Sequence, residues 1–79
     1  MKPNPLWKDY PGKSVLNLIF GQVSAEIFLL DTTNGIDTYG VIIHPYQAYE
    51  LVNLTLDQAK INAEQVLTKL LTTALSKLQ

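Results

Sequence analysis

The sequence predicts an α+β fold in which a three-stranded antiparallel sheet carries one long C-terminal helix on one face. Two observations support this fold. Residues 55–78 repeat apolar side chains at helical spacing, and two strand-like segments upstream flank Asn34 and Gly35, a pair typical of hairpin turns. With 79 residues, of which 47% are apolar, the chain is expected to build one core in a single domain.

The N-terminal segment, residues 1–13, holds three of the four prolines and is expected to form an extended arm ahead of the domain at residues 14–79. It also carries two large aromatic side chains, Trp7 and Tyr10. We favour an arm that packs these rings against the domain. The alternative is an anchor for a partner protein, because tryptophan and tyrosine dominate the energetics of interfaces.

Residues 14–20 allow two interpretations, because a short apolar run does not distinguish a buried strand from a helix. Ser14 suits a helix N-cap and Gly21 suits a helix stop, which favours a short N-terminal helix and the order α-β-β-β-α. The alternative is a strand that continues through Gly21 into the next segment.

Three later segments have strand character. Residues 22–31 alternate apolar and polar side chains, and turn residues at 32–35 lead into a return strand at residues 38–44. A third, shorter strand is expected at residues 49–54.

The long helix has a clear start and a broad apolar face. Thr55 and Gln58 have the spacing of a capping box, and Asp57 suits the positive end of the helix dipole. The apolar face consists of Leu56, Ala59, Ala63, Val66, Leu67, Leu70, Ala74 and Leu78. Leu71 and Leu75 widen this face. A face this broad can cover a sheet and still leave these two leucines for contact with a partner.

The sequence contains no arrangement that predicts catalysis or metal binding. Cysteine is absent, which excludes disulfides and thiol chemistry. Gly12-Lys13-Ser14 is similar to the end of a phosphate-binding loop, but Trp7 stands where that motif needs a glycine. His44 is the only histidine, and we interpret it as a strand-end residue. We therefore expect no enzyme activity, no cofactor, no metal and no small-molecule substrate.

The charge pattern argues against nucleic acids and membranes as partners. The formal net charge is −1, and the six basic residues are all lysines, spread from Lys2 to Lys77. A nucleic-acid-binding protein usually concentrates its basic residues in one patch or stripe. No apolar segment reaches the roughly 18–20 residues that span a bilayer, and the N-terminus lacks the features of a signal peptide. A cytoplasmic location is expected.

The order of elements resembles that of double-stranded-RNA-binding domains, which run α-β-β-β-α over a similar length. Ala59, Lys60 and Ala63 are similar to the spaced lysine and alanines of that family's last helix, whereas Leu56 and Asp57 replace the two lysines that open it. The helix is also similar to the end of HicB-type antitoxins, which share a truncated form of this fold.

We expect the chain to act through protein–protein contact, because its apolar and aromatic side chains exceed what one small core needs. The partner would be another protein or a second copy of this chain, as for an accessory subunit, an inhibitor or an antitoxin. The candidate contact residues are Trp7, Tyr10, Tyr46, Tyr49, Leu71 and Leu75.

The alternative function is that of a degenerate double-stranded-RNA-binding domain. The resemblance implies that Lys60 contacts RNA. Lys8 and Lys13 from the arm would have to converge with it on one patch, because such binding requires several phosphate contacts.

Overall fold

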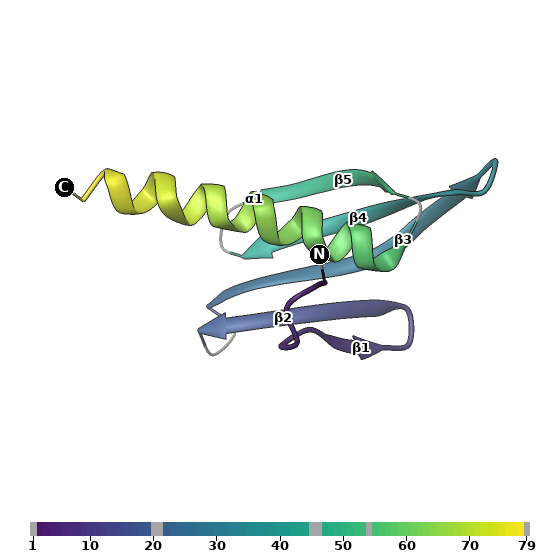
Figure 1. Cartoon of the computed structure of the whole chain (residues 1–79), viewed down its shortest axis with the longest axis horizontal. Coiled ribbons are helices and arrows are strands. Elements are labelled where there is room, and N and C mark those ends of the chain that lie inside the picture. The colour runs from purple at the N-terminus through teal and green to yellow at the C-terminus, as the bar shows by residue number, and fades with distance from the viewer. Residues whose placement is uncertain (1, 20–21, 45–46, 54, 79) are drawn as a thin grey trace.

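Five antiparallel strands and one helix make up the structure, a computed structural model that describes residues 2–19, 22–44, 47–53 and 55–78 (Figure 1). The strands are β1 (Lys8–Tyr10), β2 (Lys13–Ile19), β3 (Val23–Thr33), β4 (Ile36–His44) and β5 (Gln47–Asn53), and the helix is α1 (Leu56–Ser76). The strands lie in the sheet in their order along the chain, each antiparallel to the next. β1 and β5 are therefore the two edges of the sheet.

The prediction of a three-stranded sheet with a short N-terminal helix is wrong. Residues 13–19 form β2, which pairs with β1 on one side and β3 on the other, and part of the predicted arm is β1. Ser14 caps no helix; its hydroxyl donates to the Asp9 carboxylate on the neighbouring strand at 2.7 Å. The strand is favoured because it pairs its backbone groups on both sides, whereas a helix of one or two turns fixes several residues for few hydrogen bonds.

A tight turn joins β1 to β2. Tyr10 pairs with Lys13, so the loop between the two strands consists of Pro11 and Gly12. Gly12 has a φ of +80°, which a type II turn requires at its third residue, and proline suits the second. A proline that we expected in an irregular arm therefore starts the first hairpin.

The predicted hairpin at Asn34 and Gly35 is confirmed. β3 pairs with β4 up to Thr33 and Ile36, and the two residues between have positive φ values of 54° and 74°, as a type I′ turn needs. β5 corresponds to the third predicted strand but begins two residues earlier.

The helix begins at the predicted residue. The Gln58 backbone N–H donates to Thr55 Oγ1 at 3.1 Å, and the Thr55 backbone N–H donates to Gln58 Oε1 at 3.2 Å, which confirms the capping box. α1 lies across one face of the sheet and contacts β3, β4 and β5. Ala59 and Ala63 at this contact are fully buried, and their small size lets the helix backbone approach the strands closely.

The core lies between α1, the N-terminal arm and one face of the sheet. Its buried side chains are Leu16, Ala25, Ile27, Tyr39, Val41 and Ile43 from the strands, Ala59, Ala63 and Leu67 from the helix, and Trp7 from the arm. Successive strand side chains point to opposite faces, so every second residue of these strands lies on the other face.

The helix covers only one face of the sheet. On the other face, Phe28 pairs with Gly40, and a Cβ atom at Gly40 would lie 2.5 Å from the Phe28 ring. The glycine is therefore needed to make room for this ring. Leu30 lies near Gly40 and is exposed, as is Val52 on the same face, whereas Glu50, which pairs with Gly40, is charged.

α1 is longer than the part of it that contacts the sheet. Its 21 residues span about 31 Å, and its C-terminal turns project beyond the strands (Figure 1). Leu75 on this projecting part is 57% exposed. Among the described residues, no helix combines the length and the apolar composition needed to cross a membrane.

Replacing Leu67 with alanine should lower the free energy of unfolding by about 2–5 kcal/mol, because this side chain is buried between helix and sheet and its truncation leaves a cavity. Leu75→Ala, on the projecting part of the same helix, should change it by no more than about 0.5 kcal/mol. Urea unfolding followed by circular dichroism measures both variants. Equal losses would mean that the projecting turns belong to the core.

Candidate functional site

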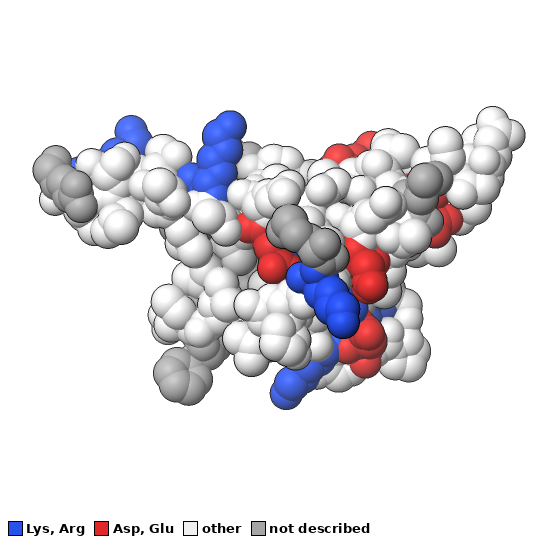
Figure 2. Space-filling view, viewed as in Figure 1, with Lys and Arg blue, Asp and Glu red and all other residues white. Residues whose placement is uncertain are grey.

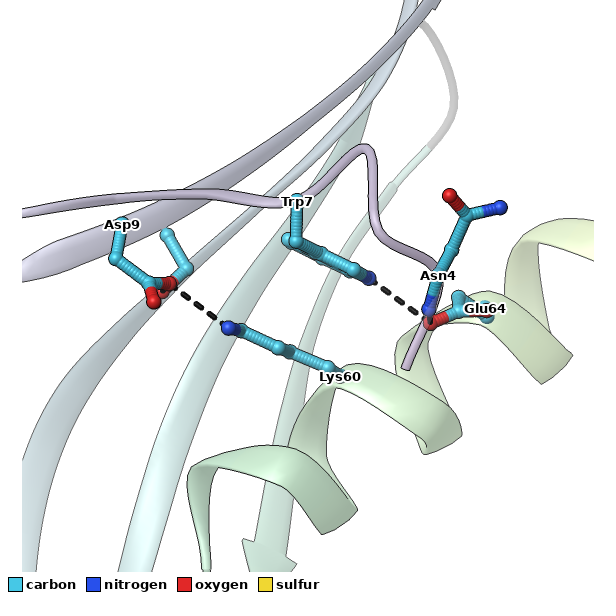
Figure 3. A network of polar contacts seen from close by, with 6 residues as sticks. Asn4, Trp7, Asp9, Lys60 and Glu64 are labelled. Carbon is cyan, nitrogen blue, oxygen red and sulfur yellow. Dashed lines mark hydrogen bonds and ion pairs between the residues drawn. The ribbon is translucent and has the colours of Figure 1, made fainter. Parts of the chain in front are cut away.

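The N-terminal arm is fastened to one side of α1, which we call the arm flank and define by Lys60 and Glu64 (Figure 3). Glu64 Oε2 accepts two hydrogen bonds at 2.9 Å, one from the indole Nε1–H of Trp7 and one from the backbone N–H of Asn4. The backbone N–H of Trp7 also donates to the Asn4 carbonyl at 3.2 Å, which closes a turn in the arm. Trp7 is only 9% exposed and Tyr10 is 50% exposed, so the interpretation of an arm that packs its rings against the domain is confirmed for Trp7 and wrong for Tyr10.

A second polar contact holds β1 to the arm flank. Lys60 Nζ lies 2.8 Å from Asp9 Oδ1, the oxygen that also accepts from Ser14. The lysine side chain is 8% exposed and the aspartate side chain 64%, so the lysine lies in the interior and its charge meets the carboxylate at the surface. The Lys60 hydrogen bond, followed by that of Ser14, holds the pKa of Asp9 below its usual value.

These contacts give Lys60 an internal role. Its ammonium group also lies 6.0 Å from the centre of the Trp7 ring. Lys8 and Lys13 are exposed, and strand alternation places both on the sheet face opposite to Asp9 and the helix. The structure therefore does not bring the three lysines of the RNA alternative together on one patch.

The six candidate contact residues for a protein partner have different environments. Trp7 is buried, whereas Tyr10 is half exposed. Lys13 Nζ lies 6.0 Å from the centre of the Tyr10 ring. Tyr49 and Leu71 are half-buried against the core, and Leu75 is exposed. Tyr46 lies outside the described residues.

A groove runs between β5 and the opposite side of α1, which we call the β5 flank and define by Asn62, Val66, Lys69 and Thr73. Asn62 Nδ2 donates to Asn53 Oδ1 at 2.7 Å and joins the helix to the end of β5. Further along the helix, a groove of about 500 Å³ opens, lined by Tyr49, Val66, Lys69, Leu70, Thr73, Ala74 and Lys77. The groove has an apolar lining, and both of its charged residues are exposed lysines. Figure 2 shows lysine side chains, and no acidic ones, on the visible face of the projecting part of the helix.

The two edges of the sheet differ in how they are protected. β1 has three residues, includes Lys8 and is followed directly by Pro11, and all of these features discourage pairing with another chain. β5 has seven residues, contains neither lysine nor proline, and keeps a continuous register with β4 over its whole length. A strand of this kind presents a regular row of unpaired backbone groups at its free edge.

A smaller cavity of about 300 Å³ lies at the other side of the helix start, lined in part by Asp9, Ser14, Tyr39 and Leu56. Three of its polar side chains already have hydrogen-bond partners. Asp9 and Ser14 bond each other, and the Tyr39 hydroxyl donates to Asp37 at 3.2 Å. Burial, together with the Asp37 carboxylate, raises the pKa of Tyr39. In the parts of the chain that the structure describes, no three potential metal ligands of the His, Cys, Asp or Glu type lie together.

Trp7 was predicted to pack and Lys60 was considered for RNA contact, but their partners Glu64 and Asp9, and the free edge beside the groove, were not predicted. Lys60 and Glu64 are four residues apart, a spacing that places two side chains on the same side of a helix. This pair of charged residues on one side of the helix was the signal for a contact with another segment. Asp9 gave no such signal, because its partners lie 5 and 51 residues away along the chain.

Comparison of the chain with protein-family models, with curated proteins and with solved structures finds no match.

Glu64→Ala should lower the free energy of unfolding by about 1–3 kcal/mol, because it removes the acceptor of two hydrogen bonds and leaves a partly buried indole N–H unpaired. Glu64→Gln retains an oxygen that can accept both bonds and should lose less. Trp7 is the only tryptophan, so its fluorescence should shift to longer wavelength in the alanine variant. Unchanged stability and emission in Glu64→Ala would show that the arm is held by packing alone.

The Lys60–Asp9 pair should contribute stability near neutral pH that is lost on acidification. Because the pKa of Asp9 is lowered in the folded state, this contribution is present above the pKa of the unfolded chain and disappears as the pH falls through the folded pKa. Asp9→Asn should therefore be less stable than the native chain at pH 7, and the difference should disappear once the pH lies below the folded pKa of Asp9. The carboxylate is 64% exposed, so solvent should keep the difference within about 0.2–1 kcal/mol. A difference that persists unchanged at low pH would contradict this account.

Proposed function

We propose that this chain is a non-enzymatic binding module that docks against another protein through the β5 edge of its sheet. The observation that carries the proposal is the unequal protection of the two edges. Monomeric proteins usually shield an edge strand with lysines, prolines, bulges or a short length, because a bare edge pairs with other chains. β1 has such protection, whereas β5 is long and regular, has neither lysine nor proline, and carries Glu50 as its one charged residue.

The surroundings of β5 support the same proposal. Val52 on this strand is 68% exposed, and the apolar groove beside Tyr49 adjoins the strand on the helix side. A partner strand at this edge would bury apolar surface on both sides of the sheet while pairing its backbone with β5. Apolar burial of about 25 cal/mol per Å² would add to these hydrogen bonds.

The rest of the molecule is suited to holding this surface in place. The helix is capped at its start, the arm is bonded to its flank, and tight turns join β1 to β2 and β3 to β4. Because a surface held in place loses little conformational freedom on binding, more of its contact energy remains as affinity. An accessory subunit, an inhibitor or an antitoxin would each use a small domain in this way, and a second copy of the chain would be the simplest partner.

Affinity capture from a native extract with the intact chain, with and without nuclease, tests the proposed function. We expect a protein to be retained in near-equal amount, and we expect Val52→Lys to reduce its retention at least about tenfold, because a lysine on an edge strand opposes pairing. Lys8→Glu at the protected edge is the matched control and should retain the partner. Both positions are exposed, so the free energy of unfolding should change by no more than about 0.5 kcal/mol.

Sedimentation of the intact chain at micromolar concentration completes the test, because it shows whether the partner is a second copy. A partner that is released by nuclease, or that is retained equally by Val52→Lys, would contradict docking at β5.

A further inference from the structure

We propose that the sheet face opposite to α1 packs against the same face of a second copy of this chain (Figure 1). We call this surface the open face and define it by Lys13, Phe28, Gly40 and Glu50 and the residues beside them. The two copies are related by a two-fold axis that runs parallel to the strands, between β3 and β4. This surface is separate from the β5 edge, so the inference goes beyond the proposed function.

The strand registers place the four defining residues side by side in one row across the sheet. Lys13 of β2 pairs with Phe28 of β3, Phe28 pairs with Gly40 of β4, and Gly40 pairs with Glu50 of β5. Because neighbouring strands lie ~4.8 Å apart, the two charged residues are about 14 Å apart at the ends of the row. Both are exposed, and neither has an ion pair with any described residue.

A two-fold axis parallel to the strands makes this row complementary to itself. Rotation about this axis reverses the order of the strands, so β2 of one copy lies opposite β5 of the other, and β3 lies opposite β4. Lys13 of each copy then meets Glu50 of the other, and both ion pairs form because a two-fold interface repeats each contact. Packed sheets lie ~10 Å apart with their strands within about 30° of each other, which keeps these long side chains within reach.

The shape of the open face fits the same arrangement. The Phe28 ring lies over Gly40, where a Cβ atom would come within 2.5 Å of it. Beside this ring is a hollow of about 350 Å³, and its lining includes Gly40, Ala48 and Glu50. The hollow exists because Gly40 has no side chain and Ala48 has a small one. Since β3 lies opposite β4 of the second copy, the Phe28 ring of that copy lies against the hollow.

The next row across the sheet contains one charge that the dimer has to accommodate. It consists of Val15, Glu26, Ile42 and Ala48 on β2 to β5. The axis sets Val15 against Ala48 of the other copy, which is an apolar contact, and Glu26 against Ile42. Lys13 lies diagonally across from Glu26 on the neighbouring strand, within reach of a long side chain. The Glu26 carboxylate therefore has a cation of its own chain beside it.

The charges argue against other ways of packing two open faces. An axis perpendicular to the strands would set each strand against its own copy, so that Lys13 meets Lys13 and Glu50 meets Glu50. An axis along β3 would set Glu26 against Glu26. Such contacts between like charges oppose association. A foreign partner would need the same row of charges in reverse order, whereas a second copy already carries it.

The dimer leaves the β5 edge accessible. Because β1 lies next to β2 in the sheet, β1 of one copy extends beyond β5 of the other copy. A strand added to β5 would lie over this β1. α1 and the groove beside it remain on the outside of the dimer, so packing of the open faces is compatible with docking at β5.

Sedimentation of the intact chain at low ionic strength, from micromolar to millimolar concentration, measures the association. We expect a reversible dimer. The single variants Lys13→Glu and Glu50→Lys should each raise its dissociation constant at least about tenfold, because two ion pairs become two repulsive contacts. Lys69→Glu, on an exposed lysine of the helix, is the matched control and should leave the constant unchanged. All three positions are exposed, and circular dichroism should show that the variants are folded.

A mixture of the two single variants provides the decisive comparison. The Lys13→Glu chain has carboxylates at both ends of the row, and the Glu50→Lys chain has ammonium groups at both ends. Each variant therefore opposes its own copy and fits the other. The equal mixture should associate about as tightly as the native chain, and so should the double variant that carries both changes.

Three outcomes would overturn the inference: no dimer at millimolar concentration, a dimer that Lys13→Glu leaves unchanged, or a mixture that associates no more tightly than its separate components. A dimer formed by pairing at the β5 edge is distinguished in two ways. It would respond to Glu50→Lys on β5 but not to Lys13→Glu on β2, and it would slow hydrogen exchange at the outward N–H groups of β5. That result would also overturn packing through the open faces.

Discussion

One helix is narrower than the sheet that it must cover, and much of the structure results from this mismatch. Five strands spaced ~4.8 Å apart span about 19 Å, whereas a helix with its side chains is about 10–12 Å wide. α1 lies over β3, β4 and β5, which would leave the apolar residues of β2 open to water. Trp7 belongs to the same buried cluster as Leu16 of β2, and its bond to Glu64 ties it to the helix. The arm thus acts as the second covering element of a core that one helix cannot close.

The same mismatch explains why the two sides of the sheet end differently. On the β2 side, the arm supplies Trp7 to the core and then continues into β1, a short strand that shields the neighbouring edge. On the β5 side, no described segment takes the corresponding place beside the helix. The helix contacts β5 only on one face of the sheet, and no described part of the chain pairs with the outer edge of β5. The groove at Tyr49 and the free edge of β5 both result from this arrangement.

The parts of the fold that sequence reasoning predicted are those determined by neighbours in the chain. The capping box at Thr55 and the turn at Asn34 depend on residues within four positions of each other, and both are present. β2 was only the alternative interpretation of residues 14–20, because Ser14, a polar residue, lies on the buried face, and because a register shift between Asn17 and Ile19 breaks the alternation. The contacts that fasten the arm to the helix join residues 51 to 60 positions apart, and no local pattern encodes such a pairing.

The charged residues on the two sides of α1 have different surroundings. On the arm flank, Lys60 and Glu64 find partners within the chain, and their contacts serve the fold. On the side of the groove, Lys69 and Lys77 have no ion pair with any described residue. Their positive charges are exposed at the surface. Exposed charges contribute more to the choice of partner and to the rate of encounter than to affinity. If a partner docks at β5 as proposed, the backbone of this strand and the apolar groove would supply most of the binding energy.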